Sequence, residues 1–281
     1  MYFLPQLAST AEDRGLLRLF LRAVLCLPFV KPSIDLRSRR ALQSHWFPVG
    51  WSCFPGRQTT RVFGRTAPTK SRCMQYMERE MPATWLLFMA IVEKVWEMAV
   101  SIFPEETAIM RRNNAGGGFL AETGFHKADI AMMRELPLHI DRQNTRGSIA
   151  AVLVLGDFRG GEASFVVTRD DDPTDKREIS VSNWHGSLFV GHYESILHEV
   201  KTVTSGTRVA VACYSNQAVW DFQRVIRAGN CSWATAQRIK MERKFILQFA
   251  VPEEREAILK EMNDGDWEMD SAGARCSEQI V

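Results

Sequence analysis

Eight short runs of strand-forming residues follow one another between residues 128 and 215, with turn residues and no helical pattern between them. Short strands at this spacing predict an antiparallel sandwich or barrel. We therefore expect a mainly β core arranged as a jelly roll, also called a double-stranded β-helix. The runs are ADIAMM (128–133), LPLHI (136–140), SIAAVLVL (148–155), EASFVV (162–167), REISVS (177–182), GSLFVGH (186–192), SILHEV (195–200) and RVAVACYS (208–215).

Helical patterns flank this region on both sides, which makes the expected fold class α+β. An apolar stretch over 83–103 has large side chains at three- and four-residue spacing and predicts a largely buried helix. Residues 16–30 are apolar with interspersed arginines and are too short to span a bilayer, which takes about 20 apolar residues. They predict an amphipathic helix packed on the protein, with a degraded targeting segment as the alternative. Helical patterns return from residue 232.

These patterns divide the chain into three parts. Residues 1–75 form an irregular, basic N-terminal region, and residues 76–250 form the helix-supported jelly roll. Residues 251–281 form a C-terminal helix and a loose tail. Within the first part, residues 57–72 hold five basic and no acidic residues. They are interpreted as a solvated loop or as a strip that contacts phosphates.

Charge and cysteine usage limit the partners and the compartment. The 35 basic and 33 acidic residues give a net charge of +2, so any DNA contact must come from a local patch. The six cysteines are scattered without zinc-type spacing. This favours reduced thiols in an intracellular protein over disulfides. P-loop, GxSxG, HExxH and dinucleotide-binding motifs do not occur in the sequence.

The stretch LPLHIDRQN, residues 136–144, carries the first chemical signal. Residues two apart in a strand point to one face, so His139 and Asp141 can offer an imidazole and a carboxylate to one divalent ion. A third ligand should come from a distant strand, where His192 and His198 are both candidates. Two histidines and one carboxylate with open positions form the facial triad of non-haem Fe(II) oxygenases.

An arginine completes this pattern. Arg208 stands ten residues after His198, on the next expected strand. A guanidinium binds a carboxylate through two parallel hydrogen bonds, so Arg208 suits the far carboxylate of a 2-oxo acid bound to the metal. A histidine and an aspartate two residues apart are a weak signal alone. The ordered set of all four residues within a jelly roll is specific.

Residues 125–222 resemble the catalytic core of the 2-oxoglutarate/Fe(II)-dependent dioxygenases. The segment VLVLGDFRGGEASF (152–165) resembles the turn between the second and third strands of that family. The segment 186–215, with its histidine, SGTR turn and arginine, resembles the distal half. The resemblance implies Fe(II), 2-oxoglutarate and O2 as cofactors. It implies His139, Asp141 and His198 as catalytic iron ligands and Arg208 as the oxoglutarate anchor, with His192 as the rival distal ligand.

Within that superfamily the chain is most similar to the TET/JBP-type nucleic-acid base oxygenases. Asn144 follows Asp141 by three residues, and an asparagine at that place helps TET enzymes recognise the target pyrimidine. A turn-forming role for Asn144 is the alternative. The strand that starts at Arg208 ends in a tyrosine, Tyr214, as in that family. Arg142 at the site entrance could contact phosphate.

The resemblance therefore implies oxidation of the methyl group of 5-methylcytosine or thymine in DNA by a monomeric enzyme. Such an enzyme would have no membrane association and would act inside the cell, in the nucleus. A prolyl-4-hydroxylase-like enzyme acting on a protein or small molecule is the first alternative. An inactive jelly-roll binding module is the second. The cysteine-rich zinc-binding region of the animal TET enzymes does not occur in this sequence.

Overall fold

The computed structural model describes most of the chain up to Trp220. The described residues are 1–7, 10–28, 45–52, 69–112, 120, 123–132, 135–168, 176–217 and 219–220. Most of the basic stretch 57–72, the helices expected from residue 232 and the C-terminal tail lie outside the described residues.

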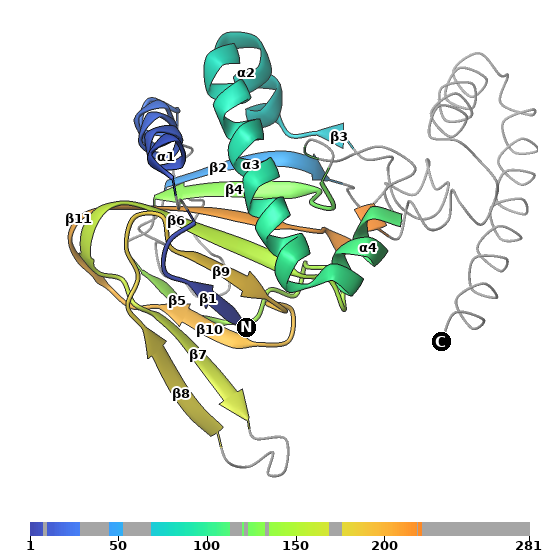
Figure 1. The fold of residues 1–281 in the computed structure, drawn as a ribbon, viewed down its shortest axis with the longest axis vertical. Helices are drawn as coiled ribbons and strands as arrows, with labels where there is room; N and C mark the ends of the chain where they lie inside the picture. The colour runs from blue at the N-terminus through green and yellow to red at the C-terminus, as the bar shows by residue number, and fades with distance from the viewer. Residues whose placement is uncertain are drawn as a thin grey trace, which may run out of the picture.

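The described strands form two antiparallel sheets (Figure 1). The large sheet has the order β1-β9-β6-β11-β4-β2-β3, and the small sheet has the order β5-β10-β7-β8. The strands are β1 (Tyr2–Leu4), β2 (His45–Ser52), β3 (Thr69–Lys70), β4 (Lys127–Met132), β5 (Leu136–His139), β6 (Ala150–Gly160), β7 (Ala163–Thr168), β8 (Lys176–Val181), β9 (Leu188–Gly191), β10 (Leu197–Val200) and β11 (Val203–Tyr214).

All eight expected strands are present, as β4 to β11, and four belong to each sheet. The chain passes repeatedly between the two sheets, which confirms the jelly roll. Its two longest strands, β6 and β11, extend beyond the expected limits into segments that the sequence assigned to turns. Gly156 and Gly206 allow this extension, because both have positive φ and a Cβ on either would lie about 2 Å from a backbone oxygen of the neighbouring strand.

Part of the N-terminal region is regular and belongs to the same core. Strand β1 pairs with β9, and β2 pairs with β4 along six residues. Phe47 and Val49 on β2 are buried. Pro48 and Gly50 interrupt the strand pattern of this segment, and they explain why the sequence favoured an irregular region there.

Helices cover one face of the large sheet (Figure 1). The expected helix over 83–103 is α3, with Phe88, Ile91 and Val95 buried. The amphipathic helix expected over 16–30 is α1, which begins earlier because Thr10 caps it in a reciprocal pair with Asp13. The sequence did not indicate α2 and α4. The helices are α1 (Ala11–Val24), α2 (Arg72–Glu80), α3 (Pro82–Ile102) and α4 (Pro104–Arg112).

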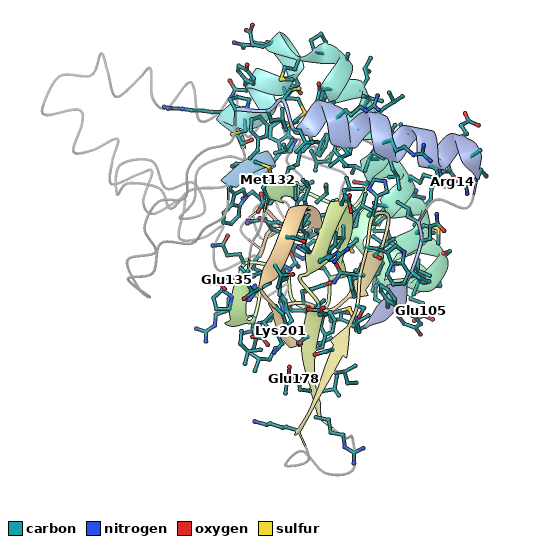
Figure 2. All side chains as sticks on the ribbon, turned by 90° about the vertical axis from the view of Figure 1, so that its left-hand side faces the viewer. Arg14, Glu105, Met132, Glu135, Glu178 and Lys201 are labelled. Atoms are coloured by element: carbon teal, nitrogen blue, oxygen red, sulfur yellow. The ribbon has the colours of Figure 1, made fainter. Side chains whose placement is uncertain are left out.

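The small sheet packs on the opposite face of the large sheet. Phe165 of β7 contacts Phe189 of β9 across the gap between the sheets, with ring centroids 5.7 Å apart. Charged side chains occupy the solvent-exposed end of the small sheet, where Lys201 forms ion pairs with Glu178 and Glu199 (Figure 2). In the described part of the chain, no helix is both long enough and apolar enough to cross a bilayer.

Candidate metal and 2-oxoglutarate site

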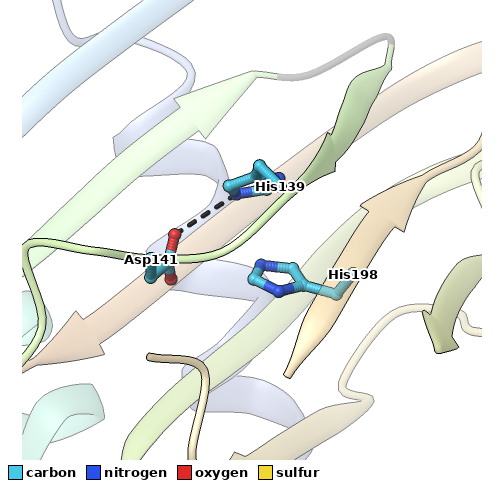
Figure 3. Close-up of side chains that lie close together, drawn as sticks. All are labelled: His139, Asp141 and His198. Carbon is cyan, nitrogen blue, oxygen red and sulfur yellow. Dashed lines mark ion pairs between the residues drawn. The ribbon is translucent and has the colours of Figure 1, made fainter. Parts of the chain in front are cut away.

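Three predicted ligands meet at the edge of the small sheet (Figure 3). His139 on β5 and His198 on β10 are direct cross-strand partners, so their side chains lie on one face with ring centroids 4.2 Å apart. Asp141 follows β5, and its Oδ1 lies 3.2 Å from Nε2 of His139. One ligand atom from each residue lies within 4.8 Å of the other two.

Main-chain hydrogen bonds orient both imidazoles. Nδ1 of His139 lies 2.8 Å from the carbonyl oxygen of Pro137, and Nδ1 of His198 lies 2.8 Å from that of Ile196. Because a carbonyl oxygen only accepts, Nδ1 carries the proton in each neutral ring, and Nε2 keeps its lone pair. This is the tautomer that a metal ligand needs, and the partner of the second nitrogen fixes it.

The surroundings shift the pKa values of the two histidines in opposite directions. Burial lowers the pKa of His198, which keeps this ring neutral. Burial also acts to lower the pKa of His139, but the hydrogen bond and the charge of Asp141 outweigh it, and the pKa is raised. Two imidazoles that can be neutral and one carboxylate at this spacing fit divalent iron. They leave coordination positions for other ligands.

His192, the rival third ligand, belongs to a different environment. Its Nδ1 lies 3.2 Å from the carbonyl oxygen of Ser148, and its Nε2 lies 4.0 Å from Glu106 of α4. Its ring packs edge-on against Phe103. Among the described residues, the three-residue cluster contains His198 and not His192.

Arg208 lies on β11 at the same interface between the sheets. It is opposite Gly156 of β6 and only 3% exposed. Burial lowers the pKa of its guanidinium to about 10, so it remains charged at neutral pH. Gly161 leaves room for its stem, because a Cβ there would lie 3.1 Å from Cδ of Arg208.

Tyr193 connects Arg208 to the three ligands, and the sequence did not indicate it. Its buried ring meets His198 edge-on at 4.8 Å, and its carbonyl oxygen accepts a hydrogen bond from the backbone N–H of Asp141. Burial raises the pKa of its hydroxyl, as does the charge of Asp141, while the nearby charge of Arg208 lowers it. Tyr193 thus contacts His198 of the ligand cluster and lies close enough to Arg208 for the two groups to influence each other electrostatically.

Tyr214, a predicted substrate residue, also faces the gap between the sheets. Its hydroxyl donates a hydrogen bond of 2.8 Å to Asp129 of β4. Asp129 is 7% exposed, and burial raises the pKa of its carboxyl group. This buried carboxyl was not predicted, because Asp129 occupies an ordinary position in an expected strand.

Asn144 and Arg142, the other predicted substrate residues, lie in the turn after Asp141. Asn144 is buried, and its Nδ2 lies 3.4 Å from Oδ2 of Asp141. Its backbone N–H also bonds to the carbonyl oxygen of Asp141, so Asn144 makes a turn and faces the ligand cluster as well. Arg142 is exposed beside it.

No protein-family model and no curated protein matches the chain. Among solved structures it is similar to a 2OG-Fe(II) oxygenase family oxidoreductase from Burkholderia pseudomallei, with 14% sequence identity and a TM-score of 0.47 over 76% of this chain and 86% of that chain. It is similar to NgTET1 in complex with 5mC DNA, with 12% identity and a TM-score of 0.46 over 77% of this chain and 72% of that chain.

A Pseudomonas putida prolyl-4-hydroxylase is similar as well, with 14% identity and a TM-score of 0.39 over 76% of this chain and 91% of that chain. Similarities at this level do not distinguish one substrate class from another. Its function is therefore inferred from the residues of this chain.

Proposed function

We propose that the chain is an Fe(II)- and 2-oxoglutarate-dependent dioxygenase that oxidises the methyl group of a pyrimidine base, 5-methylcytosine or thymine, in DNA. The observation that carries the proposal is the convergence of His139, Asp141 and His198 with ligand atoms within 4.8 Å. Both imidazoles are held in the tautomer that a metal requires.

Each residue near the site has a defined task in this proposal. His139, Asp141 and His198 hold the iron through two Nε2 atoms and a carboxylate oxygen. Arg208 binds the distal carboxylate of 2-oxoglutarate, and its burial strengthens that ion pair by excluding water. The buried ring of Tyr193 packs against His198, and its task in the proposal is to exclude water from this side of the site. When bound, iron and 2-oxoglutarate supply the oxidation of an unreactive C–H bond.

Asn144 supports a base as the substrate. A side-chain amide offers a donor and an acceptor, and both are needed to read the edge of a base. It is buried within hydrogen-bonding reach of the ligand Asp141, and the exposed guanidinium of Arg142 stands next to it. A base in duplex DNA must leave the helix to reach such a site. A DNA substrate also underlies our proposal of a nuclear location.

The proposal is tested by mass spectrometry of nucleosides. The full chain is incubated with Fe(II), 2-oxoglutarate and DNA that contains 5-methylcytosine, with thymine as the other methylated base. We expect a hydroxymethyl product and one succinate per oxidation. The Asp141→Ala variant, which lacks one ligand, should form neither product.

The alternative substrates are included in the same experiment. Proline-containing peptides are offered in parallel under the same conditions. A hydroxylated peptide without any oxidised base would replace the DNA proposal by a protein hydroxylase. Wild-type protein that releases no succinate with any substrate, and binds no Fe(II), would leave only a jelly-roll binding module.

A further inference from the structure

A pocket of about 520 Å³ lies next to the ligand cluster. Asn144 lines the pocket, and its Nδ2 lies 3.4 Å from Oδ2 of Asp141. The pocket and the ligand cluster therefore lie on either side of this residue. None of the three ligands lines the pocket, so it is a separate compartment. Its lining residues are Arg142, Asn144, Thr145, Arg146, Gln217 and Trp220.

Main-chain hydrogen bonds build the pocket from two distant segments. The backbone N–H of Thr145 donates to the carbonyl oxygen of Ser215 at 2.9 Å, and that of Gln217 donates to Gln143 at 3.0 Å. The backbone N–H of Arg146 donates to Oε1 of Gln217 at 3.0 Å. The turn after Asp141 is thus fixed to the segment that follows β11, and the pocket is preformed.

The rim of the pocket is positively charged. Arg142 and Arg146 are exposed, and neither guanidinium forms an ion pair with another described residue. Of the acidic groups described near this turn, Glu194 accepts a hydrogen bond from the backbone N–H of Gly147 and Asp141 pairs with His139. Two such guanidinium groups on one rim suit a phosphate.

The interior of the pocket combines an aromatic ring with a buried hydroxyl. The ring of Trp220 packs partly against the apolar core, which holds it in place. Thr145 is 1% exposed, and its Oγ1 has no hydrogen-bond partner among the described residues. This hydroxyl oxygen has almost no accessible surface, so the pocket presents chiefly the ring of Trp220 and the two guanidinium groups. A stacking surface and a cationic rim together match a nucleotide.

We propose that this pocket binds the nucleotide next to the one that is oxidised, on the same strand. Its base stacks on Trp220, while its phosphate pairs with Arg142 and Arg146. The proposal rests on the proposed function, and it adds that the flanking nucleotide, and not only the methylated base, determines binding. Asn144 separates the two nucleotides.

The test is a double-mutant cycle between protein and DNA. The probe is a labelled single-stranded pentanucleotide with central 5-methylcytosine, together with versions in which the nucleotide on either side is abasic. Binding is measured by fluorescence anisotropy with the full chain, without Fe(II) or 2-oxoglutarate, so the result does not depend on turnover. Trp220→Leu is compared with Trp184→Leu, which alters an exposed tryptophan elsewhere.

We expect Trp220→Leu to weaken binding of the intact probe roughly five- to hundredfold, as for loss of one stacked base. One abasic probe should weaken wild-type binding similarly, and the two changes together should cause no further loss. Trp220→Phe keeps an aromatic face and should restore most of the affinity. Arg142→Gln combined with Arg146→Gln should reduce the salt dependence of binding by about one unit per lost phosphate contact.

Several results would overturn the proposal. They are wild-type affinity in Trp220→Leu, additive losses in the cycle, or equal competition by an acidic peptide. If the wild type oxidises DNA but shows no coupling to the flanking nucleotide, the pocket proposal fails and the proposed function stands. If coupling is found but no base is oxidised in the separate turnover assay, the pocket binds the nucleotide beside 5-methylcytosine and the proposed function fails.

Discussion

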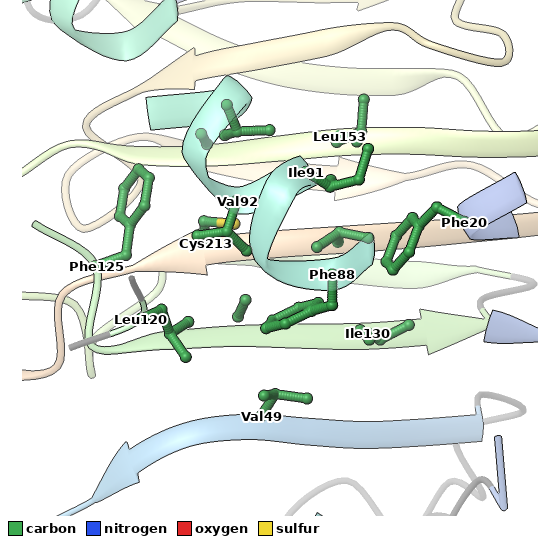
Figure 4. Close-up of a cluster of buried hydrophobic side chains, with 14 of the residues drawn as sticks. Phe20, Val49, Phe88, Ile91, Val92, Leu120, Phe125, Ile130, Leu153 and Cys213 are labelled. Atoms are coloured by element: carbon green, nitrogen blue, oxygen red, sulfur yellow. The ribbon is translucent and has the colours of Figure 1, made fainter. Parts of the chain in front are cut away.

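The two faces of the large sheet are built from the same strands and differ in chemistry. On the face toward the helices, Val209, Val211 and Cys213 of β11 pack with residues of α3 such as Phe88 in a fully buried apolar cluster (Figure 4). On the face toward the small sheet, the alternate residues of the same strand include Arg208 and Tyr214. Both faces are buried, but of these residues of β11 only Arg208 carries a charge at neutral pH.

This difference separates stability from function within one sheet. Alternation along a strand lets β11 contribute apolar residues to the core and polar residues to the site without conflict. Because water is excluded from both faces, burial lowers the pKa of Arg208 and raises that of Asp129. We therefore expect substitutions on the helix-covered face to reduce stability, and substitutions on the site face to reduce turnover.

The largest effect is expected for Asp141→Ala. This change removes one of three ligands, and we expect 2-oxoglutarate turnover to fall to the background of a protein-free control. The side chain is partly exposed, so the melting temperature should change little. Succinate release, Fe(II) titration and thermal melting measure the three quantities. His192→Ala is the matched control, and loss of iron binding in that variant but not in His198→Ala would reverse the ligand assignment.

The next largest effect is expected on the helix-covered face. Phe88 is fully buried and its ring packs against those of Phe20 and Trp85. Phe88→Ala should lower the free energy of unfolding by about 3–5 kcal/mol. This corresponds to a fall in melting temperature of about 6–20 °C.

An exposed residue of the same helix provides the control for Phe88→Ala. Leu86 is 70% exposed, and Leu86→Ala should change the free energy of unfolding by less than about 0.5 kcal/mol. Turnover per folded molecule of Phe88→Ala, measured well below its melting temperature, should equal that of the wild type. Loss of turnover without loss of stability would show that the two faces are not independent.

A smaller effect is expected for Arg208→Lys on the site face. Lysine keeps the charge but loses the two parallel hydrogen bonds to a carboxylate. The KM for 2-oxoglutarate should rise roughly tenfold to a hundredfold, since hydrogen bonds to charged groups contribute about 1.5–3 kcal/mol. A 2-oxo acid without a distal carboxylate provides the comparison. If its KM rises equally, Arg208 does not bind that carboxylate.

The smallest effect is expected for Asp129→Asn. Burial raises the pKa of Asp129 in the folded state, so folding favours the protonated carboxyl. The stability that this group contributes is present in acid and is lost as the pH rises through its folded pKa. Asparagine cannot ionise and can still accept the hydrogen bond from Tyr214, so the variant should gain stability relative to the wild type as the pH rises.

Thermal melting across a pH series measures this difference. Asp157→Asn, at an exposed position of β6, provides the control and should show no such trend. Parallel curves for Asp129→Asn and the wild type would indicate that folding does not raise the pKa of Asp129.

Much of the site could be predicted because strand alternation acts locally. His139 and Asp141 are two residues apart, so the sequence alone placed them on one side. The choice between His198 and His192 depends on the register of β10 against β5, which places His198 opposite His139. That register arises from contacts between distant segments, and the spacing along the chain does not encode it.

Other features could not be predicted because they also arise from contacts between distant segments. Asp129 occupies an ordinary strand position, and only the packing of the two sheets makes it a buried carboxyl group. Trp220 and Thr145 line one pocket because hydrogen bonds join the segment after β11 to the turn after Asp141. In β2, Pro48 obscured a strand whose alternate residues are buried.

The orientation of the two histidine ligands has a consequence for how such a site can evolve. Each Nδ1–H is held by the carbonyl oxygen of the residue two positions earlier, Pro137 or Ile196. Every amino acid carries that carbonyl, so these hydrogen bonds can survive replacement of either side chain. The surrounding sequence is therefore free to diverge without loss of the ligand tautomer. A short pair of strands transferred to another protein would carry the correct tautomers with it.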